Sequence, residues 1–249
     1  MPSKKTDLVR ALLNSIQTGD PAGIQVVNED VYIQHNPQTH EGSEGLAALF
    51  ARLAKTNPRV NVVRAFTDGD YVFGHVEYDF STRRIGFEVF RFEGDRIVEH
   101  WDNIQPRQGP NASGRSMVDG PTEATDLHLT EANRALVRSF YEDVLIGGNH
   151  DRLEVYLNAD NYLQHGPHGR DGVQPVREAL STADLSFDRQ HRVLAEGDFV
   201  LSVCEGTLEG VQTSFYDLFR VKAGKLVEHW DTVEAVPPRS EWKNSNGKF

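Results

Sequence analysis

The sequence has few of the features that mark secreted, metal-binding, membrane or nucleic-acid-binding proteins. Its one cysteine, Cys204, excludes an internal disulfide and leaves no Cys/His cluster for structural zinc. No apolar run approaches the length needed to cross a membrane. Lysine and arginine number 26 against 37 acidic residues, so the formal net charge is −11, and no basic cluster offers a surface for nucleic acid or anionic lipid. These absences predict a cytoplasmic protein whose partner is a small molecule.

Three sequence blocks occur twice in the chain. Glu-His-Trp-Asp at 99–102 returns at 228–231, and Tyr-x-Gln-His at 32–35 returns at 162–165. A third block at 88–91 returns in similar form at 217–220. The same order at a nearly constant offset indicates two copies of one domain, which we place at residues 1–106 and 128–238. Residues 107–127, rich in Gly, Pro and Ser, form the expected linker, and the polar tail is expected to be frayed.

Each copy changes from helical spacing to strand alternation along its length. In copy one, Leu8, Leu12 and Ile16 predict a helix that Thr6 or Asp7 would cap, and Asp20-Pro21 predicts the start of a second. Helices followed by an antiparallel meander indicate the α+β class. We therefore expect two tandem cone-shaped domains, each with N-terminal helices packed on a curved, mostly antiparallel sheet that encloses a pocket. The expected strands are residues 60–66, 71–80, 86–92 and 97–104, then 187–194, 199–207, 213–221 and 226–233.

The last two strands of each copy form a hairpin that decides which side chains share a face. In copy two, a three-residue loop with Gly224 in the left-handed conformation would form a bulge and place Asp217 opposite His229. A two-residue turn would instead turn the tryptophan of each motif to that face. With the bulge, one face carries Glu88, Phe90, His100 and Asp102 in copy one and Asp217, Phe219, His229 and Asp231 in copy two.

Two carboxylates and an imidazole on one face can carry out acid–base chemistry if that face lines a pocket. Neighbouring carboxylates in a low-dielectric site cannot both ionise easily, so one pKa rises towards the range of a general acid or base. The alternative is that these acids lie on a solvated face. The candidate catalytic residues are Asp102, Glu88, His100, Asp231, Asp217 and His229, and no metal site is expected.

Further polar and aromatic residues are candidates for substrate binding. His35 and His165 either meet substrate at the pocket mouth or bond to backbone at a tight turn. His75 and Asn36 align with Val203 and Gly166, so copy one has the richer polar set and is the favoured catalytic copy. The candidate binding residues are Tyr32, His35, Asn36, His75 and Phe90 in copy one and Tyr162, His165 and Phe219 in copy two.

These blocks resemble the SnoaL-like polyketide cyclase family of the nuclear transport factor 2-like superfamily. The resemblance rests on Gln-His-Asn-Pro at 34–37 and Glu-His-Trp-Asp at 99–102, with their counterparts in copy two. It implies a cone-shaped fold with an internal pocket and cofactor-free aldol-type ring closure in which Asp102 and Asp231 act as general acid and base. The family pairs this aspartate with a histidine, where the present sequence has Glu88 and Asp217. The two copies would form an intramolecular pseudo-dimer, with further self-association possible.

The sequence is compatible with three classes of function. A cofactor-free lyase or isomerase would remove a proton alpha to a carbonyl, for cyclisation or isomerisation of a small apolar or polyketide-like substrate. A hydrolase would use the paired carboxylates to activate water, for example on an epoxide. A non-catalytic pseudo-dimer would only bind a small molecule.

Overall fold

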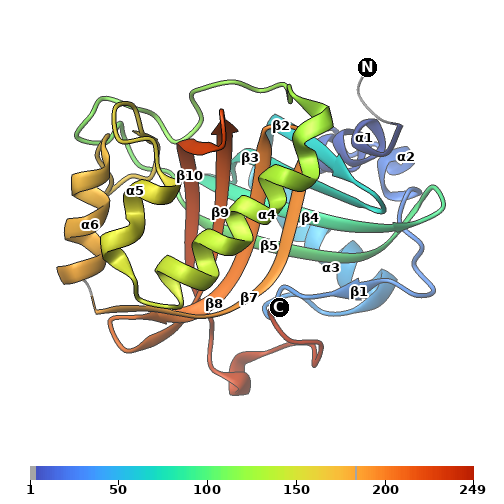
Figure 1. The fold of residues 1–249 in the computed structure, drawn as a ribbon. Helices are drawn as coiled ribbons and strands as arrows, with labels where there is room; N and C mark the ends of the chain where they lie inside the picture. The colour runs from blue at the N-terminus through green and yellow to red at the C-terminus, as the bar shows by residue number, and fades with distance from the viewer. Residues whose placement is uncertain (1–3, 183) are drawn as a thin grey trace. The chain divides into compact units, whose positions relative to one another are not determined.

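The computed structural model describes residues 4–182 and 184–249 and divides into two compact units. Unit 1 holds the chain up to Arg107 together with Pro237–Phe249, and unit 2 holds Gln108–Val236. Within the described residues, each unit contains one five-stranded sheet (Figure 1). The segment expected to link the copies therefore belongs to unit 2. The tail, which was expected to be frayed, belongs to unit 1.

Unit 1 begins with its helices and ends with its longest strands. Asp20 accepts the backbone N–H of Ala22 at 2.9 Å and Pro21 is the first helical residue, which confirms the predicted start of the second helix. The first helix already includes Lys4, so the caps predicted at Thr6 or Asp7 are wrong. The helices are α1 (Lys4–Thr18), α2 (Pro21–Ile24) and α3 (Gly42–Ala54), and the strands are β1 (Ile33–Gln34), β2 (Arg59–Asp68), β3 (Tyr71–Asp79), β4 (Arg83–Glu93) and β5 (Arg96–Pro106).

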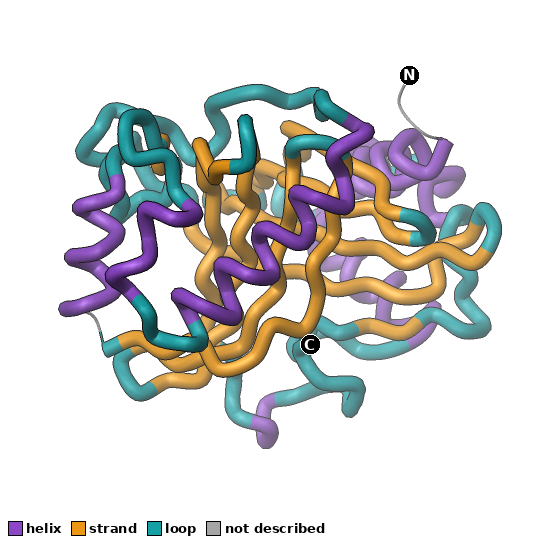
Figure 2. Tube along the Cα trace, viewed as in Figure 1, coloured by secondary structure: helices purple, strands orange, loops and turns teal. Residues whose placement is uncertain are grey.

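Unit 2 repeats the order of helices and strands. Its longest helix, α4, lies across one face of the sheet (Figure 1), and Figure 2 shows the long strands and the loops that join them. The helices are α4 (Thr130–Phe140), α5 (Leu153–Tyr156) and α6 (Val173–Thr182), and the strands are β6 (Leu163–Gln164), β7 (Leu185–Glu196), β8 (Phe199–Leu208), β9 (Val211–Lys222) and β10 (Lys225–Ala235). Short helical turns occupy Leu127–Leu129, Tyr141–Leu145, His150–Arg152 and, in unit 1, Arg239–Glu241.

The two sheets have the same strand order and the same pairing of the repeated blocks. The orders are β1-β5-β4-β3-β2 and β6-β10-β9-β8-β7. In each sheet the short first strand pairs in parallel with the last strand, while the other neighbours are antiparallel. Gln34 pairs with His100, and Gln164 pairs with His229. The predicted α+β class with two successive helix-and-sheet units is confirmed.

The hairpin turn of unit 2 differs from the predicted one, although the predicted face is correct. Ala223 and Gly224 both have positive φ and form a two-residue turn, with Lys222 paired to Lys225. The register shift lies further along, between Leu226 and Glu228. The two-residue turn alone would have put the acid of β9 and the histidine of β10 on opposite faces. The extra residue at the bulge reverses this change, so the acids and the histidine still share one face.

The pairing within that face is shifted from the prediction. Asp217 lies opposite Asp231 rather than opposite His229, which pairs with Phe219. Unit 1 has the equivalent shift between Arg91 and Phe92, so Glu88 pairs with Asp102 and Phe90 with His100. The predicted positions of Asp217 opposite His229 and of Glu88 opposite His100 are therefore wrong by one cross-strand pair.

One face of each sheet packs against the helices, and we call it the inner face. In unit 1, Val9, Leu12 and Leu13 recur at helical spacing and form one apolar cluster with Tyr78 and Phe90 of the sheet. Side chains alternate along a strand, so residues two positions from Phe90 face the same side. The unit 2 cluster joins helix residues to Phe215 and Phe219 in the same manner. No helix among the described residues is both long and apolar enough to span a membrane.

Candidate acid–base site

Two acids and one histidine meet on the inner face of the unit 1 sheet. Glu88 on β4 lies opposite Asp102 on β5, and His100 lies opposite Phe90 in the neighbouring pair. Glu88, Asp102 and His100 are only 3%, 6% and 8% exposed. His100 Nε2 is 2.7 Å from Glu88 Oε2. The repeated motif therefore contributes an acid and an imidazole to a buried cluster.

A chain of hydrogen bonds runs through this cluster. The Tyr78 hydroxyl donates to Glu88 Oε1 at 2.8 Å. On the far side of the imidazole, His100 Nδ1 is 3.0 Å from Gln34 Oε1, an oxygen that also accepts the backbone N–H of Asn36. Both ring nitrogens therefore face oxygen acceptors, an arrangement that favours the doubly protonated imidazolium. We call Gln34, Tyr78, Glu88, His100 and Asp102 the inner cluster of unit 1.

Unit 2 contains a matching chain. The Tyr141 hydroxyl donates to Asp217 Oδ2, and His229 Nε2 is 2.8 Å from Asp217 Oδ1. His229 Nδ1 is 2.9 Å from Gln164 Oε1, which also accepts the backbone N–H of Gly166. The shorter aspartate thus keeps both partners that the glutamate has in unit 1. Tyr141, Gln164, Asp217, His229 and Asp231 form the inner cluster of unit 2.

The two tyrosine donors come from different parts of the fold. Tyr78 lies on β3, where the aligned position of unit 2 is Gly206. A Cβ added at Gly206 would lie 3.0 Å from the Phe215 ring, so that side of the sheet has no room for a second tyrosine. Tyr141 instead follows α4, in the turn Tyr141–Leu145. Both units therefore have a tyrosine hydroxyl that donates to the buried acid, although the two tyrosines come from different positions in the fold.

The acids keep the buried imidazoles protonated. Burial acts to lower the pKa of His100, but the hydrogen bond to Glu88 and the charges of Glu88 and Asp102 outweigh burial and raise it. For His229, burial acts in the same direction, and Asp217 and Asp231 likewise raise its pKa overall. Each unit thus holds a buried acid–imidazolium pair with a second carboxylate beside it.

The second carboxylate of unit 1 faces nitrogen donors. Asp102 Oδ2 accepts the amide of Asn36 at 2.8 Å. The ammonium of Lys248 lies 3.7 Å from Asp102 Oδ1, and both side chains are almost completely buried. Asp102 therefore has an amide donor on one carboxylate oxygen and an ammonium near the other.

The second carboxylate of unit 2 has a different environment. Gly166 stands where unit 1 has Asn36, and a Cβ there would lie only 2.7 Å from Asp231 Oδ1. Asp231 is partly exposed, unlike Asp102, although its Oδ1 is buried. Burial raises the pKa of the Asp231 carboxyl, the charge of His229 opposes this shift, and the charge of Asp217 adds to it. The raised pKa makes Asp231 the candidate general acid or base of unit 2.

His35 and His165 lie on the other face of the last strand, so they do not join the acids. His35 stacks on Trp101 with ring centroids 4.5 Å apart, and its Nε2 is 2.9 Å from Glu99 Oε1. Its Nδ1 is 3.0 Å from a backbone oxygen, that of Gly247. This geometry corresponds to the backbone-bonded alternative and not to a group at the pocket mouth. We call His35, Trp101, Glu99 and Arg91 the histidine clamp of unit 1.

Unit 2 contains an equivalent histidine clamp. His165 stacks on Trp230 at 4.7 Å, and its Nε2 is 2.8 Å from Glu228 Oε1. Its Nδ1 is 2.8 Å from the backbone oxygen of Ser116. Arg220 Nε is 2.7 Å from Glu228 Oε2, as Arg91 Nε is 2.6 Å from Glu99 Oε2 in unit 1. The repeated tetrapeptide therefore contributes to two separate groups of residues. Its Glu and Trp belong to the histidine clamp, and its His and Asp belong to the inner cluster.

The remaining predicted binding residues divide between the two faces. Tyr32 and Tyr162 are buried, and their pKa values are raised by burial and by the charges of the inner-cluster acids. Phe90 and Phe219 stack on His100 and His229 at 4.6 and 4.7 Å. His75, a candidate binding residue, pairs with Phe87 and stacks on it at 4.5 Å, so it lies on the opposite face from Glu88.

Sequence reasoning missed several members of the inner clusters. Gln34 and Gln164 are identical between the copies, which was a usable signal, but their carbonyl contacts depend on the parallel pairing of a two-residue strand. Tyr78 and Tyr141 do not align, so repetition could not reveal them. Lys248 belongs to the tail that was expected to be frayed.

The ligand atoms of Glu88, His100 and Asp102 lie within 4.8 Å of one another, a spacing that a metal ion could use. However, the Lys248 ammonium already faces Asp102. Both nitrogens of His100 also face acceptors, whereas a ligating histidine must be deprotonated. The arrangement fits proton chemistry better than metal ligation.

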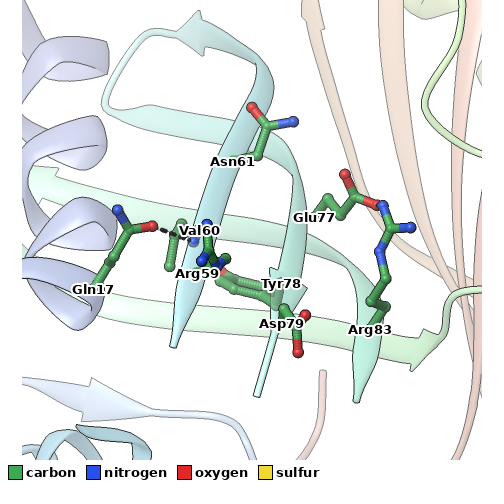
Figure 3. Close-up of a pocket in the computed structure, with 8 residues that line it drawn as sticks. All are labelled: Gln17, Arg59, Val60, Asn61, Glu77, Tyr78, Asp79 and Arg83. Carbon is green, nitrogen blue, oxygen red and sulfur yellow. Dashed lines mark hydrogen bonds and ion pairs between the residues drawn. The ribbon is translucent and has the colours of Figure 1, made fainter. Parts of the chain in front are cut away.

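A surface hollow of about 510 Å³ in unit 1 is lined by Tyr78, one residue of the inner cluster (Figure 3). Tyr78 forms part of its wall and reaches Glu88 with its hydroxyl. Figure 3 shows the ion-paired side chains of Glu77 and Arg83 pointing toward one another. The hollow therefore lies one side chain away from Glu88. Its lining residues are Gln17, Arg59, Val60, Asn61, Glu77, Tyr78, Asp79 and Arg83.

Solved structures with a related fold align over less than half of the chain. A proposed ketosteroid isomerase from Kribbella flavida is 20% identical, with 44% of this chain and 84% of that chain covered and a TM-score of 0.39. An NTF2-like protein of unknown function from Cytophaga hutchinsonii is 20% identical, with 46% and 95% covered and a TM-score of 0.37. IdmH, a proposed polyketide cyclase from Streptomyces antibioticus, is 17% identical, with 41% and 93% covered and a TM-score of 0.36.

A search of curated proteins finds no match to the chain. The family described as SnoaL-like domain matches residues 9–100, which run from α1 to the histidine of the inner cluster on β5. This range includes both repeated blocks of copy one, at 32–35 and 88–91, and the first two residues of the tetrapeptide at 99–102. Residues 9–100 of this chain are therefore similar to a SnoaL-like domain.

Proposed function

We propose that this protein is a cofactor-independent acid–base catalyst that isomerises or cyclises a small carbonyl compound. The observation that supports the proposal most directly is a carboxyl group beside a buried acid–imidazolium pair in each unit. Asp231 lies on the inner face opposite Asp217, and Asp217 contacts the imidazole of His229. Such a carboxyl can take a proton from a carbon acid and return it at another position.

Each member of the inner cluster has a separate role in this reaction. Asp231 exchanges the proton, because it is partly exposed and its raised pKa brings both of its protonation states within reach. Asp217 positions the imidazole, since it accepts the Tyr141 hydroxyl and lies 2.8 Å from His229 Nε2. The imidazolium compensates the charge of Asp217, which leaves the site able to tolerate the negative charge that develops on a substrate enolate.

We assign the larger share of turnover to unit 2, although the richer polar set of copy one favoured that copy from sequence. Asp102 accepts the amide of Asn36 and lies beside the Lys248 ammonium. A nearby cation makes a carboxylate a weaker base, which takes a proton from a carbon acid less readily.

The test uses a six-membered β,γ-unsaturated ketone, whose conversion to the conjugated enone is followed by ultraviolet absorption. The double variant D102N/D231N is expected to lose at least about 100-fold in rate, the usual scale of general acid–base catalysis. The single variants then show how turnover divides between the units. The exposed acid Asp95 lies on the same hairpin as Asp102, and D95N is the matched control.

Undiminished turnover in the double variant would exclude both aspartates as the proton-transfer groups. If the ketone raises the melting temperature of the wild type but is never converted, the inner clusters bind ligand without catalysis. Transfer of labelled solvent oxygen into an epoxide would instead assign the carboxylates to hydrolysis.

A further inference from the structure

Two segments outside the sheets share a short sequence pattern. The linker segment (residues 108–120) contains Asn-Ala-Ser-Gly-Arg at 111–115, and the tail segment (residues 237–249) contains Asn-Ser-Asn-Gly-Lys at 244–248. The order is asparagine, two small or polar residues, glycine and a basic residue. Both glycines, Gly114 and Gly247, have positive φ. The repeat therefore extends beyond the final strand of each unit.

The asparagine of each pattern fastens its segment to the loop after the first strand. Asn111 is buried, and its Nδ2 donates to the backbone oxygens of Gln164 and Gly166. Asn244 Nδ2 donates to the backbone oxygens of Asn36 and Thr39 at 2.7 and 2.9 Å. The two contacts involve equivalent loops, since Asn36 aligns with Gly166.

The histidine clamp of each unit holds the same segment from the other side. His35 Nδ1 contacts the backbone oxygen of Gly247, and His165 Nδ1 contacts that of Ser116. In the linker segment the asparagine and imidazole contacts lie on the two sides of Arg115. In the tail segment both contacts precede Lys248, and the Gly247 contact is at the adjacent residue. The fold therefore holds the backbone next to each basic residue.

The basic residues of the two segments have different partners. Arg115 Nε lies 2.8 Å from both carboxylate oxygens of Asp171 and so takes no part in the inner cluster. Lys248 Nζ donates to the backbone oxygen of Asp102 at 2.8 Å and lies 3.7 Å from its Oδ1. The side chain of Lys248 is 2% exposed. A buried lysine is costly unless it is paired, and its position points to an electrostatic role.

We propose that the tail segment completes the inner cluster of unit 1, with Lys248 as the positioning residue whose positive charge compensates the carboxylate of Asp102. This inference rests on the proposed function for its chemical meaning, although its electrostatic content can be measured without any substrate. In unit 2 the corresponding basic residue, Arg115, is bound to Asp171 instead.

The charges around Asp102 explain why one cation matters. The ionisable groups facing it are Glu88 from β4, His100 from β5, Lys248 from the tail segment and the neutral Tyr32 and Tyr78. With two carboxylates, an imidazolium and an ammonium, the cluster is neutral. Without Lys248 it would carry one uncompensated negative charge, which protonation of Asp102 would remove.

The experiment follows the carboxyl carbon of Asp102 by NMR titration of protein labelled with ¹³C at the aspartate carboxyl groups. The Asp102 signal is assigned by its loss in D102N. We expect K248M to raise the titration midpoint of Asp102 by about 1–3 pH units, the usual effect of an opposite charge at this distance. K248R is expected to keep the midpoint near that of the wild type.

The matched control is K243M, which removes an exposed lysine from the same segment. A midpoint that K248M leaves at the wild-type value would overturn the proposal. Should K248M fail to fold, the titration of the Lys248 ammonium gives the reciprocal measurement in the wild type and in D102N. Its midpoint is expected to fall in D102N, and an unchanged midpoint would also overturn the proposal.

These titrations separate the inference from the proposed function. If D102N/D231N retains full turnover while K248M shifts Asp102, the function is wrong and the electrostatic role of Lys248 stands. If turnover depends on both aspartates but Asp102 titrates alike in wild type and K248M, only the role of Lys248 is wrong.

Discussion

Asp217 lies directly opposite Asp231 across the β9–β10 hairpin, so two carboxylates form one cross-strand pair on the inner face of unit 2. Like charges in such a pair are destabilising. Asp217 is compensated by the Tyr141 hydroxyl and the His229 imidazolium. The unfavourable interaction therefore remains at Asp231. Burial raises the pKa of Asp231, the His229 charge opposes this shift, and the Asp217 charge adds to it. Ionisation of Asp231 therefore destabilises unit 2.

The pH dependence of the free energy of unfolding should reveal the cost of ionising Asp231. A carboxyl whose pKa is raised in the folded state stabilises the fold at low pH, and this stability is lost as the pH rises from the ordinary value of 3.8 through the folded-state value. D231N should therefore raise the free energy of unfolding at pH 7 by on the order of 1 kcal/mol. The gain should vanish below the ordinary aspartate pKa, as measured by thermal unfolding from acid to neutral pH.

The matched variant in unit 1 should change stability in the opposite direction. D102N removes the charge that faces Lys248, and a buried cation left without its partner is destabilising. We expect a loss of about 1–3 kcal/mol at pH 7. An equal response of the two variants would contradict the difference between Asp102 and Asp231.

The tyrosine donors should contribute similar stability from their different positions. Y78F and Y141F each remove a hydroxyl that donates to a buried carboxylate, and each should lower the free energy of unfolding by about 1.5–3 kcal/mol in urea denaturation. Tyr71 is partly exposed and lies on the same strand as Tyr78, so Y71F is the control. If Y78F is as mild as Y71F, the Tyr78–Glu88 bond carries no net stability.

The sequence was sufficient for the face of the hairpin but not for its register. Alternation groups His229 with Asp231, but whether Asp217 shares their face depends on the register. The predicted and observed registers differ by two residues, so the predicted face is kept. The pairing depended on a turn at Ala223-Gly224 and a bulge near Val227, whose two shifts compensate each other. A bulge has no residue signature as strong as that of a turn, and so the cross-strand neighbours could not be assigned.

Residues that join the site from distant segments were harder to predict than those of the repeat. His35 belongs to a repeated block, yet a parallel strand and the Trp101 ring place it on the far face. Lys248 is one lysine in a polar segment, and only the contacts of Asn244 with Asn36 and of His35 with Gly247 show how the tail segment is held where Lys248 is buried. The positions of these residues depend on tertiary contacts, which produce no periodic pattern in the sequence.

The inner-cluster imidazoles should make stability depend on pH in the neutral range. The pKa values of His100 and His229 are raised above the ordinary 6.5, because their acid partners outweigh burial. Their contribution is complete below pH 6.5 and is lost as the pH rises through the folded-state values. Thermal unfolding of the wild type and of H100Q/H229Q should therefore differ most near pH 6 and converge as the pH increases. A difference that grows with pH would show that the imidazoles are neutral in the folded protein.

Gly166 lacks a side chain because Asp231 occupies the space beside it. A Cβ at this position would lie 2.7 and 3.0 Å from the two carboxylate oxygens of Asp231. G166A should therefore displace Asp231 and lower the free energy of unfolding by about 1–3 kcal/mol, the usual effect of overpacking. Its NMR titration should also change, because the carboxyl must move relative to Asp217.

Unit 2 offers a matched control for this variant. Gly109 has an ordinary φ and nothing within 4 Å of an added Cβ, so G109A should change stability by less than about 1 kcal/mol and leave the Asp231 titration unchanged. In unit 1, N36A keeps the Cβ and removes only the amide that donates to Asp102. A wild-type Asp231 midpoint in G166A would show that the carboxyl can leave Gly166 without changing its surroundings. The glycine would then have no part in setting the difference between Asp231 and Asp102.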